Sequence, residues 1–336
     1  MQLSEGKLRR MKAIANDHGV ITAAAMDHRG ALKKALAASR GVDMRELSSE
    51  VITTFKMAVS RVLSPYTSAI LLDPIFGLEA ARVRAKGVGL LLAYELSGYD
   101  TTRPGRLPDL LPHFSVRRLV EWGADAVSIN LYYTHHEDPG VNDAKHAFVE
   151  RIGAECEAHQ MPFFLESVGY DPAGGDERSM EFAAQKPEIV KRTMEEFSKP
   201  QYKVDVLKVE FPVSAEFVPG SSVYRGQKAY SRDEALRHLR GAASVAGKPF
   251  IFLSAGVSHT HFIELLQMAA EAGTDHSGVL CGRATWKDGI PIFGQQGMRA
   301  LEDWLHREGV RRITAVNDAI RSATPWFEKM GIAAPV

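Results

Sequence analysis

Eight short apolar runs, each followed by a longer amphipathic stretch, constrain the fold of this chain more than any other feature. The runs are Ile21–Met26, Ser68–Leu72, Gly89–Tyr94, Ala126–Tyr132, Phe163–Val168, Val206–Phe211, Phe250–Leu253 and Gly278–Leu280. The helical patterns between and after them are Met44–Leu63, Phe76–Ala85, Ser115–Trp122, Asp143–His159, Glu177–Phe197, Arg232–Val245, Thr260–Glu271 and Gln295–His306. Regular alternation of strands and helices indicates a parallel sheet, which eight repeats can close into an α/β barrel of the (β/α)8 type, the TIM barrel.

An open, doubly wound sheet is the alternative architecture. We favour the closed barrel because the strand count reaches eight and no Gly-x-Gly-x-x-Gly turn follows the first run. The chain has 336 residues, which fits one barrel of roughly 250 residues with extensions. We therefore predict a single barrel domain over residues 1–336, with a helical extension at 1–18 and a C-terminal helix and tail at 308–336.

Charge, hydropathy and cysteine content limit the kinds of partner and the cellular location that we expect. The formal net charge is zero, which gives no reason to expect nucleic acid or an anionic membrane as a partner. No stretch approaches the 18 or so apolar residues of a membrane span, and the charged N-terminal segment does not resemble a signal peptide. The two cysteines, Cys156 and Cys281, lie in helical and strand patterns and suggest no disulfide framework. We therefore expect a reducing, cytoplasmic location.

Lys208 is the residue that most strongly suggests chemistry. It lies in the sixth apolar run, between Val206 and Phe211, and would point off one face of a buried strand. Burial disfavours the ammonium form, so we expect a lowered pKa and an amine able to attack a carbonyl and form a Schiff base. The alternative is a structural lysine paired with Asp205 or Glu210.

Ionisable and small residues gather where the predicted strands end, which is where barrel active sites form. Asp27, His28 and Arg29 follow the first strand, Glu95 the third, and Glu166 lies on the fifth. Small residues follow the last two strands, in Ser254-Ala255-Gly256 and Gly282-Arg283. Backbone N–H groups in these two loops often bind phosphate in barrels, and Arg283 would add a bidentate contact. Ordinary turn glycines with a surface arginine are the alternative.

Metal binding is the competing chemistry. His135 and His136 are followed by Glu137 and Asp138, but neighbouring histidines on extended chain point in different directions, so we expect a solvated loop. His259 and His261 have no evident third ligand nearby in the sequence. We therefore predict no metal site and no cofactor.

The chain resembles the class I tagatose-1,6-bisphosphate aldolases from about residue 3 to residue 327. The resemblance rests on motifs that occur in the same order: Leu71–Pro74, Leu91–Glu95, Gly98–Thr102, Arg106–Asp109, Phe163–Glu166, Asp205–Glu210, Leu253–Ser258 and Val279–Trp286. It implies a metal-independent barrel enzyme that cleaves a ketohexose 1,6-bisphosphate to dihydroxyacetone phosphate and glyceraldehyde 3-phosphate. A phosphorylated sugar is thus the expected partner, and we expect a homo-oligomer.

The resemblance also implies roles for individual residues. Lys208 would form the Schiff base, Glu166 would act as acid and base, and Asp27 would orient the substrate hydroxyls. The phosphate on the dihydroxyacetone side would bind to Ser254, Gly256, Gly282 and Arg283, and the far phosphate to Arg29. The remaining substrate-binding candidates are His28, Glu95, Ser128 and Asn130.

Two residues depart from the family pattern. Ser128 stands where the family has a lysine, and His28 where it usually has a glutamine. The missing lysine would remove an inward cation that favours the neutral amine of Lys208. Two alternatives follow: an aldolase for another anionic sugar, such as a sulfosugar phosphate, distinguished at Arg29 and His28, or a non-catalytic phosphosugar-binding or regulatory protein.

Overall fold

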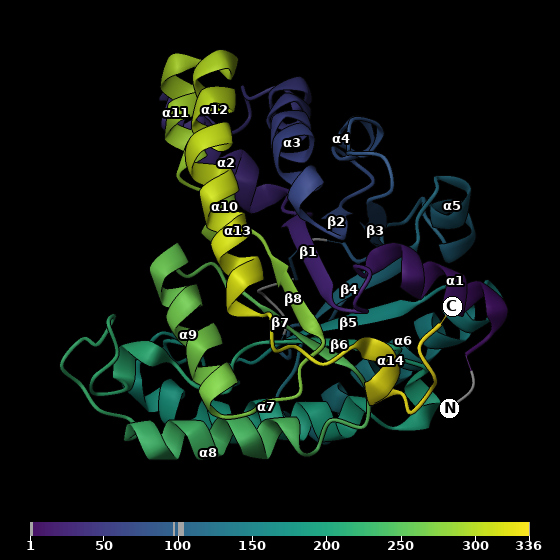
Figure 1. The fold of residues 1–336 in the computed structure, drawn as a ribbon, viewed down its shortest axis with the longest axis vertical. Coiled ribbons are helices and arrows are strands. Elements are labelled where there is room, and N and C mark those ends of the chain that lie inside the picture. The colour runs from purple at the N-terminus through teal and green to yellow at the C-terminus, as the bar shows by residue number, and fades with distance from the viewer. Residues whose placement is uncertain (1–2, 97, 100–103, 336) are drawn as a thin grey trace.

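The computed structural model describes residues 3–96, 98–99 and 104–335. Its eight strands are parallel and pair in sequence order, and β8 pairs with β1 to close the ring (Figure 1). The strands are β1 (Ile21–Met26), β2 (Ala69–Leu72), β3 (Gly89–Ala93), β4 (Ala126–Tyr132), β5 (Phe163–Val168), β6 (Val206–Val209), β7 (Phe250–Leu253) and β8 (Gly278–Cys281). The predicted (β/α)8 barrel is confirmed, and the open sheet is wrong. Part of the Gly98–Thr102 motif and the ends of both predicted extensions lie outside the described residues.

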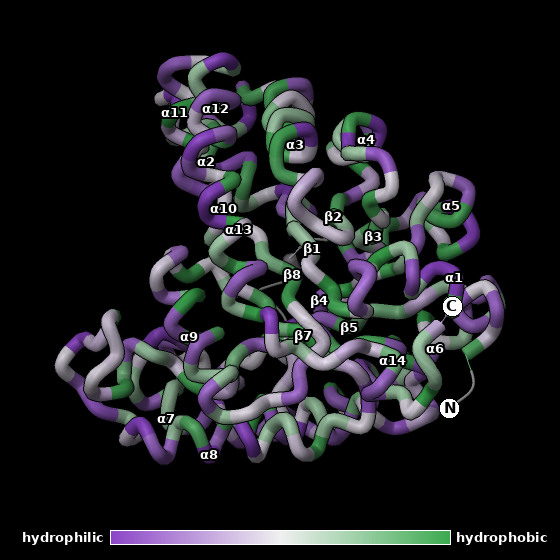
Figure 2. The backbone as a smooth tube through the Cα atoms, viewed as in Figure 1, coloured by the Kyte–Doolittle hydropathy of each residue, from purple (hydrophilic) through white to green (hydrophobic). Residues whose placement is uncertain are grey.

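The two-residue alternation of strand side chains decides what faces the inside of the barrel. In β1, Ile21, Ala23 and Ala25 join an inner cluster, whereas Ala24 and Met26 pack outward under the helices. Figure 2 shows hydrophobic residues concentrated along the central strands and hydrophilic ones on the outer helices. Toward the carboxyl-terminal ends of the strands, the inward-facing positions change from apolar to polar residues. These polar residues are Asp27, Glu95, Asn130, Glu166 and Lys208.

Helices surround the ring. The main ones are α2 (Gly30–Arg40), α3 (Ser49–Leu63), α4 (Leu78–Arg82), α5 (Val116–Glu121), α6 (Pro139–Ala158), α7 (Met180–Phe197), α8 (Arg232–Ala243) and α9 (His259–Glu271). After β8 follow α10 (Arg283–Trp286), α11 (Gly289–Gln296), α12 (Met298–Trp304), the π-helical η4 (Leu305–Gly309) and α13 (Val310–Ala319). Single 3₁₀ turns occur at η1 (Ser64–Tyr66), η2 (Pro200–Tyr202) and η3 (Ala215–Phe217). None of the helices in the described ranges is long and apolar enough to cross a membrane.

Several element bounds differ from the prediction. Helix α2, which is rich in alanine and buries Leu32 and Leu36, was not predicted, and α3 begins at Ser49 rather than Met44. The predicted helix Gln295–His306 is interrupted because Gly297 has φ +84°, outside the helical region. Strand β6 ends at Val209, where its pairing with β7 stops. Glu210 and Phe211 therefore belong to the loop.

The amino-terminal end of the barrel is closed by two helices from opposite ends of the chain. α1 (Glu5–Ile14) and α14 (Trp326–Lys329) contribute Met11, Ile14 and Trp326 to the inner cluster (Figure 1). Nζ of Lys7 lies 2.6 Å from Oδ2 of Asp205, just before β6, and fixes α1 to this end. The carboxyl-terminal end of the strands therefore carries the opening of the barrel.

Candidate active site

A cavity of about 510 Å³ opens at the carboxyl-terminal ends of the strands. The predicted site residues that line it are Asp27, His28, Arg29, Glu95, Asn130, Glu166, Lys208, Ser254, Gly256, Gly282 and Arg283. Ser128 is the exception. It is buried one layer below Asn130, in register with Ala93 on β3 and Phe164 on β5. The fold therefore gathers nearly all predicted residues around one space.

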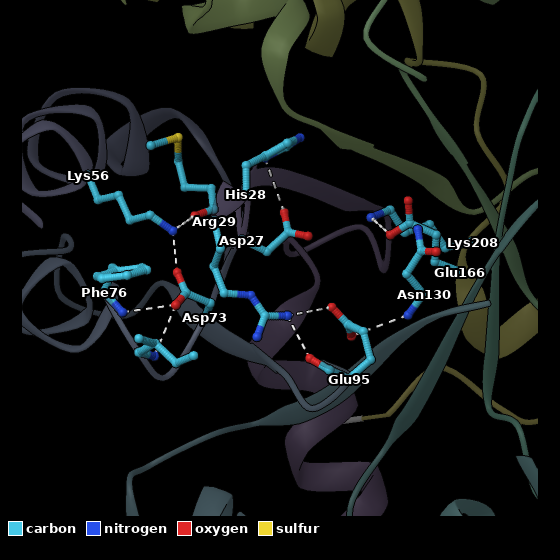
Figure 3. A network of polar contacts seen from close by, with 12 residues as sticks. Asp27, His28, Arg29, Lys56, Asp73, Phe76, Glu95, Asn130, Glu166 and Lys208 are labelled. Atoms are coloured by element: carbon cyan, nitrogen blue, oxygen red, sulfur yellow. Dashed lines mark hydrogen bonds and ion pairs between the residues drawn. The ribbon is translucent and has the colours of Figure 1, made fainter. Parts of the chain in front are cut away.

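Lys208 and Glu166 form the centre of the cavity. They are register partners on β6 and β5, so their inward side chains start from the same level of the barrel. Nζ of Lys208 donates a hydrogen bond to Oε2 of Glu166. Figure 3 shows the two side chains pointing toward each other, with Asn130 from β4 beside them. Lys208 is only 3% exposed, so this ion pair is shielded from solvent.

The electrostatic environment of Lys208 corrects one expectation from the sequence. Burial acts to lower its pKa, but the carboxylates of Glu166 and Asp27 outweigh burial and raise the pKa above its ordinary value. Burial raises the pKa of Glu166, and Asp27 adds to this effect, although Lys208 opposes it. The predicted lowered pKa of Lys208 is therefore wrong for the unliganded protein. A proton is instead held between two groups that both bind it more tightly than usual.

The alternative partners of Lys208 are engaged elsewhere. Asp205 pairs with Lys7 at the opposite end of the barrel. Glu210 lies 3.0 Å from Nζ of Lys186 and accepts a hydrogen bond from the backbone N–H of Gly169. The alternative, a structural lysine paired with one of these carboxylates, is therefore wrong.

Asp27 and His28 lie at the end of β1. Oδ1 of Asp27 is 3.6 Å from Nδ1 of His28, and both atoms are buried without a hydrogen-bond partner among the described residues. Burial acts to raise the pKa of Asp27, but His28, Lys208 and Lys56 outweigh it and hold the pKa below its ordinary value. Burial, helped by Arg283, lowers the pKa of His28 to about 4. At neutral pH the pair is a carboxylate beside a neutral imidazole, which suits binding of hydroxyl groups.

Arg29 is held firmly by Glu95. Its Nη2 donates to the backbone oxygen of Glu95 at 2.6 Å and to Oε1 at 3.0 Å (Figure 3). Oε2 of Glu95 accepts a 3.2 Å hydrogen bond from the backbone of Asn130. Burial, with repulsion from Asp27 and Glu166, raises the pKa of Glu95 to about 8 despite Arg29. The carboxyl that holds Arg29 is therefore largely protonated at neutral pH.

A fully buried ion pair lies beneath the side of the cavity that Arg29 and Glu95 line. Lys56 on α3 contacts Asp73 after β2 and donates to the backbone oxygen of Met26 at 2.6 Å. Oδ1 of Asp73 also accepts 2.9 Å hydrogen bonds from the backbones of Ile75 and Phe76. Asp73 thus fixes the ends of β1 and β2 rather than lining the cavity.

The loops after β7 and β8 meet at Gly256 and Arg283. Gly256 has φ +74°, and a Cβ added there would lie 2.7 Å from Cζ of Arg283. The guanidinium therefore packs directly against the glycine backbone, and no larger residue fits without moving it. Nζ of Lys287 lies 3.3 Å from the backbone oxygens of Gly256 and Val257 and supports this loop from behind. Backbone and guanidinium donors thus converge on one side of the cavity.

The side of the cavity opposite Gly256 and Arg283 is lined by residues for which the sequence predicted no role. Tyr99, Arg106 and Tyr132 line the cavity there. Arg106 belongs to one of the motifs that carried the resemblance, yet it lies in a long loop where neither helix nor strand periodicity gives an orientation. The signal available in the sequence was its positive charge within the motif Arg106–Asp109.

The histidines give no support for a metal site. His135 and His136 stack on each other with ring centroids 3.9 Å apart. Across the described ranges, no cluster of three or more histidine, cysteine, aspartate or glutamate side chains is arranged to hold a metal ion.

Comparison with known proteins identifies the family. A model of the "DeoC/LacD family aldolase" matches residues 21–288. "Tagatose 1,6-diphosphate aldolase 2" of Enterococcus faecalis is 49% identical over 99% of both chains. "Tagatose 1,6-diphosphate aldolase" of Listeria monocytogenes is 45% identical over 98% of this chain and 96% of the relative.

Solved structures agree in fold. A fructose-bisphosphate aldolase from Plasmodium falciparum, in complex with TRAP and an inhibitor, superposes with a TM-score of 0.69 at 13% identity, covering 96% of this chain and 97% of the other. A Schiff base-forming fructose-1,6-bisphosphate aldolase has a TM-score of 0.56 at 16% identity, covering 93% and 98%. These two likenesses concern the fold, whereas the family match and the full-length relatives show that this chain belongs to the DeoC/LacD family of aldolases.

Proposed function

We propose that this protein is a class I aldolase that reversibly cleaves a ketohexose 1,6-bisphosphate of the tagatose or fructose type. The products are dihydroxyacetone phosphate and glyceraldehyde 3-phosphate. The observation that carries the proposal is the shielded contact between Lys208 and Glu166 at the centre of the cavity. The relatives named tagatose 1,6-diphosphate aldolases support the choice of substrate.

The ion pair supplies the nucleophile. An ammonium cannot attack a carbonyl, so Lys208 must first lose a proton. Glu166 is in hydrogen-bond contact and has a raised pKa, so the proton can pass to it without leaving the cavity. The neutral amine then attacks C2 of the ketose and gives a carbinolamine. The carbinolamine hydroxyl departs as water after taking the proton from Glu166, which leaves an iminium.

The iminium then accepts the electrons of the breaking bond. Glu166, now ionised, takes the proton from the C4 hydroxyl as the C3–C4 bond breaks. The aldehyde leaves, and the bonding electrons form an enamine on the fragment still joined to Lys208. Protonation of C3 and hydrolysis of the resulting iminium release dihydroxyacetone phosphate and restore the amine. The ionised Asp27 is suited to orient the substrate hydroxyls during these steps.

The remaining groups are proposed to position the substrate. The backbone of Ser254, Gly256 and Gly282 and the guanidinium of Arg283 would bind the phosphate on the dihydroxyacetone side. His28, Asn130 and Glu95 would contact the sugar hydroxyls. Ser128 would act from below the cavity, by shaping the layer on which Asn130 lies.

Borohydride trapping tests the proposal directly. Incubation with dihydroxyacetone phosphate and borohydride should give a stable adduct, and peptide mass mapping should locate it on Lys208. An adduct on another lysine, or no adduct, would refute the assignment. Cleavage should also survive EDTA, and activity lost to EDTA and restored by zinc would instead indicate a metal-dependent aldolase.

We further propose that the protein acts in the cytoplasm as a homo-oligomer. Both cysteines are buried and free, which agrees with a reducing compartment. Sedimentation analysis at several concentrations tests the assembly, and a monomer throughout would contradict it.

A further inference from the structure

Arg106 brings a positive charge to the side of the cavity that faces away from the proposed phosphate loops. It lies in the loop between β3 and α5, whereas Gly256 and Arg283 follow β7 and β8. In a closed ring of eight strands in sequence order, β3 is four positions from β7. Arg106 and Arg283 therefore line opposite sides of the same cavity.

The guanidinium of Arg106 is held in place by aromatic rings. Its Cζ lies 5.0 Å from the ring centre of Tyr99, 5.2 Å from that of Tyr132 and 4.6 Å from that of Tyr170. Such contacts fix a guanidinium without consuming its N–H donors. Nη2 donates to Glu177 at 2.5 Å, and the side chain remains 20% exposed. Donors are therefore available to a ligand in the cavity.

The loop that carries Arg106 is also anchored. The hydroxyl of Tyr170 donates to Oε2 of Glu137 at 2.5 Å, accepts a 2.8 Å hydrogen bond from Lys145 and lies 3.1 Å from the backbone oxygen of Gly105. Arg106 itself has φ +46°, a left-handed conformation that costs a non-glycine residue energy. The surrounding contacts maintain this conformation and direct the side chain into the cavity.

Arg29, to which the resemblance assigns the far phosphate, is the more buried of the two arginines. Its side chain is only 5% exposed and its Nη2 is occupied twice by Glu95, while Nε and Nη1 have no hydrogen-bond partner among the described residues. Figure 3 shows its guanidinium turned toward Glu95. Both arginines line the cavity, but Arg106 is the more exposed, at 20%, and lies across the cavity from Arg283.

We propose that Arg106 binds the anionic group at C6 of the substrate and thereby selects sugars that carry an anion at both ends. The inference rests on the proposed function, since it assumes that the phosphate at C1 lies near Gly256 and Arg283. A phosphate or a sulfonate at C6 could each accept a pair of hydrogen bonds from the guanidinium.

Kinetics with two substrates test this role. For Arg106→Gln, kcat/KM for a ketohexose 1,6-bisphosphate should fall about 10- to 100-fold, which corresponds to loss of a hydrogen bond to a charged group. With the matching ketohexose 1-phosphate, which lacks the distal anion, kcat/KM should change less than about 2-fold. Arg106→Lys should show an intermediate loss, because it keeps the charge without the bidentate geometry. The value of kcat/KM for a 6-sulfonate analogue distinguishes a general anion site from a site selective for phosphate.

Arg178→Gln is the matched control, because Arg178 is exposed next to Glu177 and does not line the cavity. Equal losses on both substrates, or no loss on the bisphosphate, would overturn the role of Arg106. Borohydride trapping with dihydroxyacetone phosphate separates this failure from failure of the proposed function. The Arg106 variants should still form the Lys208 adduct, because this ligand has no distal anion. A parent protein that neither forms the adduct nor cleaves the bisphosphate overturns both proposals.

Discussion

Lys208 and Glu166 lie directly opposite each other on neighbouring parallel strands, and the ion pair between them is largely shielded from solvent. The two residues lie 42 positions apart in the sequence. Together they form a proton-sharing pair at the centre of a cavity, with Asp27 near enough to raise the pKa of both. The position of the proton in this pair is therefore central to the proposed chemistry.

Glu166→Gln should lower kcat by about 10²- to 10⁴-fold, the usual contribution of a general acid and base. An amide neither takes the proton of Lys208 nor returns one during dehydration. Steady-state cleavage assays measure the loss. Glu188→Gln on the exposed face of α7 should leave kcat unchanged. A Glu166→Gln enzyme with normal turnover would assign the proton transfers to another group.

Gly256→Ala should weaken substrate binding as well as the fold. The φ of +74° makes alanine unfavourable by about 1–2 kcal/mol, and its Cβ would collide with Arg283. Gly41→Ala is the matched control, since Gly41 has φ +67° with open space around it. Urea denaturation should show similar losses for both variants, whereas only Gly256→Ala should raise KM. Unchanged KM in Gly256→Ala would argue against a phosphate site at this loop.

Ser128→Lys should raise the cleavage rate on a ketohexose 1,6-bisphosphate. Ser128 lies one inward position below Asn130, so an extended lysine could reach the level of Lys208 and Glu166, about 7 Å higher. A cation there would favour the neutral amine of Lys208 and stabilise developing negative charge. The comparison is made at saturating substrate on folded protein. A rate no higher than that of the parent on any bisphosphate would indicate a pocket adapted to another substrate.

Protein stability should fall as pH rises through the range set by Glu95. Its pKa is about 8 in the folded protein against an ordinary value of 4.5, so between these values the folded state binds the extra proton. Stability then decreases with increasing pH and levels off above about 8, because both states have lost the proton. Glu95→Gln, which resembles the protonated form, should remove this part of the slope. Urea titrations at pH 5.5 to 9 measure it, and identical slopes for both proteins would contradict the assignment.

Lys56→Met should destabilise the protein by about 3–5 kcal/mol, because it leaves the carboxylate of Asp73 buried without its partner. The double variant Lys56→Met with Asp73→Asn should recover much of this loss. An asparagine keeps the side-chain oxygen that accepts the N–H groups of Ile75 and Phe76. Denaturation of the three proteins measures the effect. A double variant no more stable than Lys56→Met would show that the charge of Asp73 is not the cause.

The sequence by itself determined the barrel and the face on which most site residues lie. Strand side chains alternate with a period of two, so Lys208 and Glu166 point inward because their apolar neighbours Val206 and Phe164 do. Parallel strands also bring their carboxyl ends together, which gathers Asp27 and Arg283 from distant parts of the chain at one opening. These inferences need only local pattern and the closure of the ring.

Only the tertiary structure decided how these residues act on one another. The pKa of Lys208 is raised rather than lowered, because the effect depends on distances to carboxylates on other strands, which sequence spacing does not encode. The same holds for Asp205, which lies near Lys208 in sequence but binds Lys7 at the other end of the barrel. Arg106 is the clearest example of a residue whose orientation the sequence alone could not predict. Its orientation comes from three tyrosines on separate segments, and such contacts exist only once the barrel has closed.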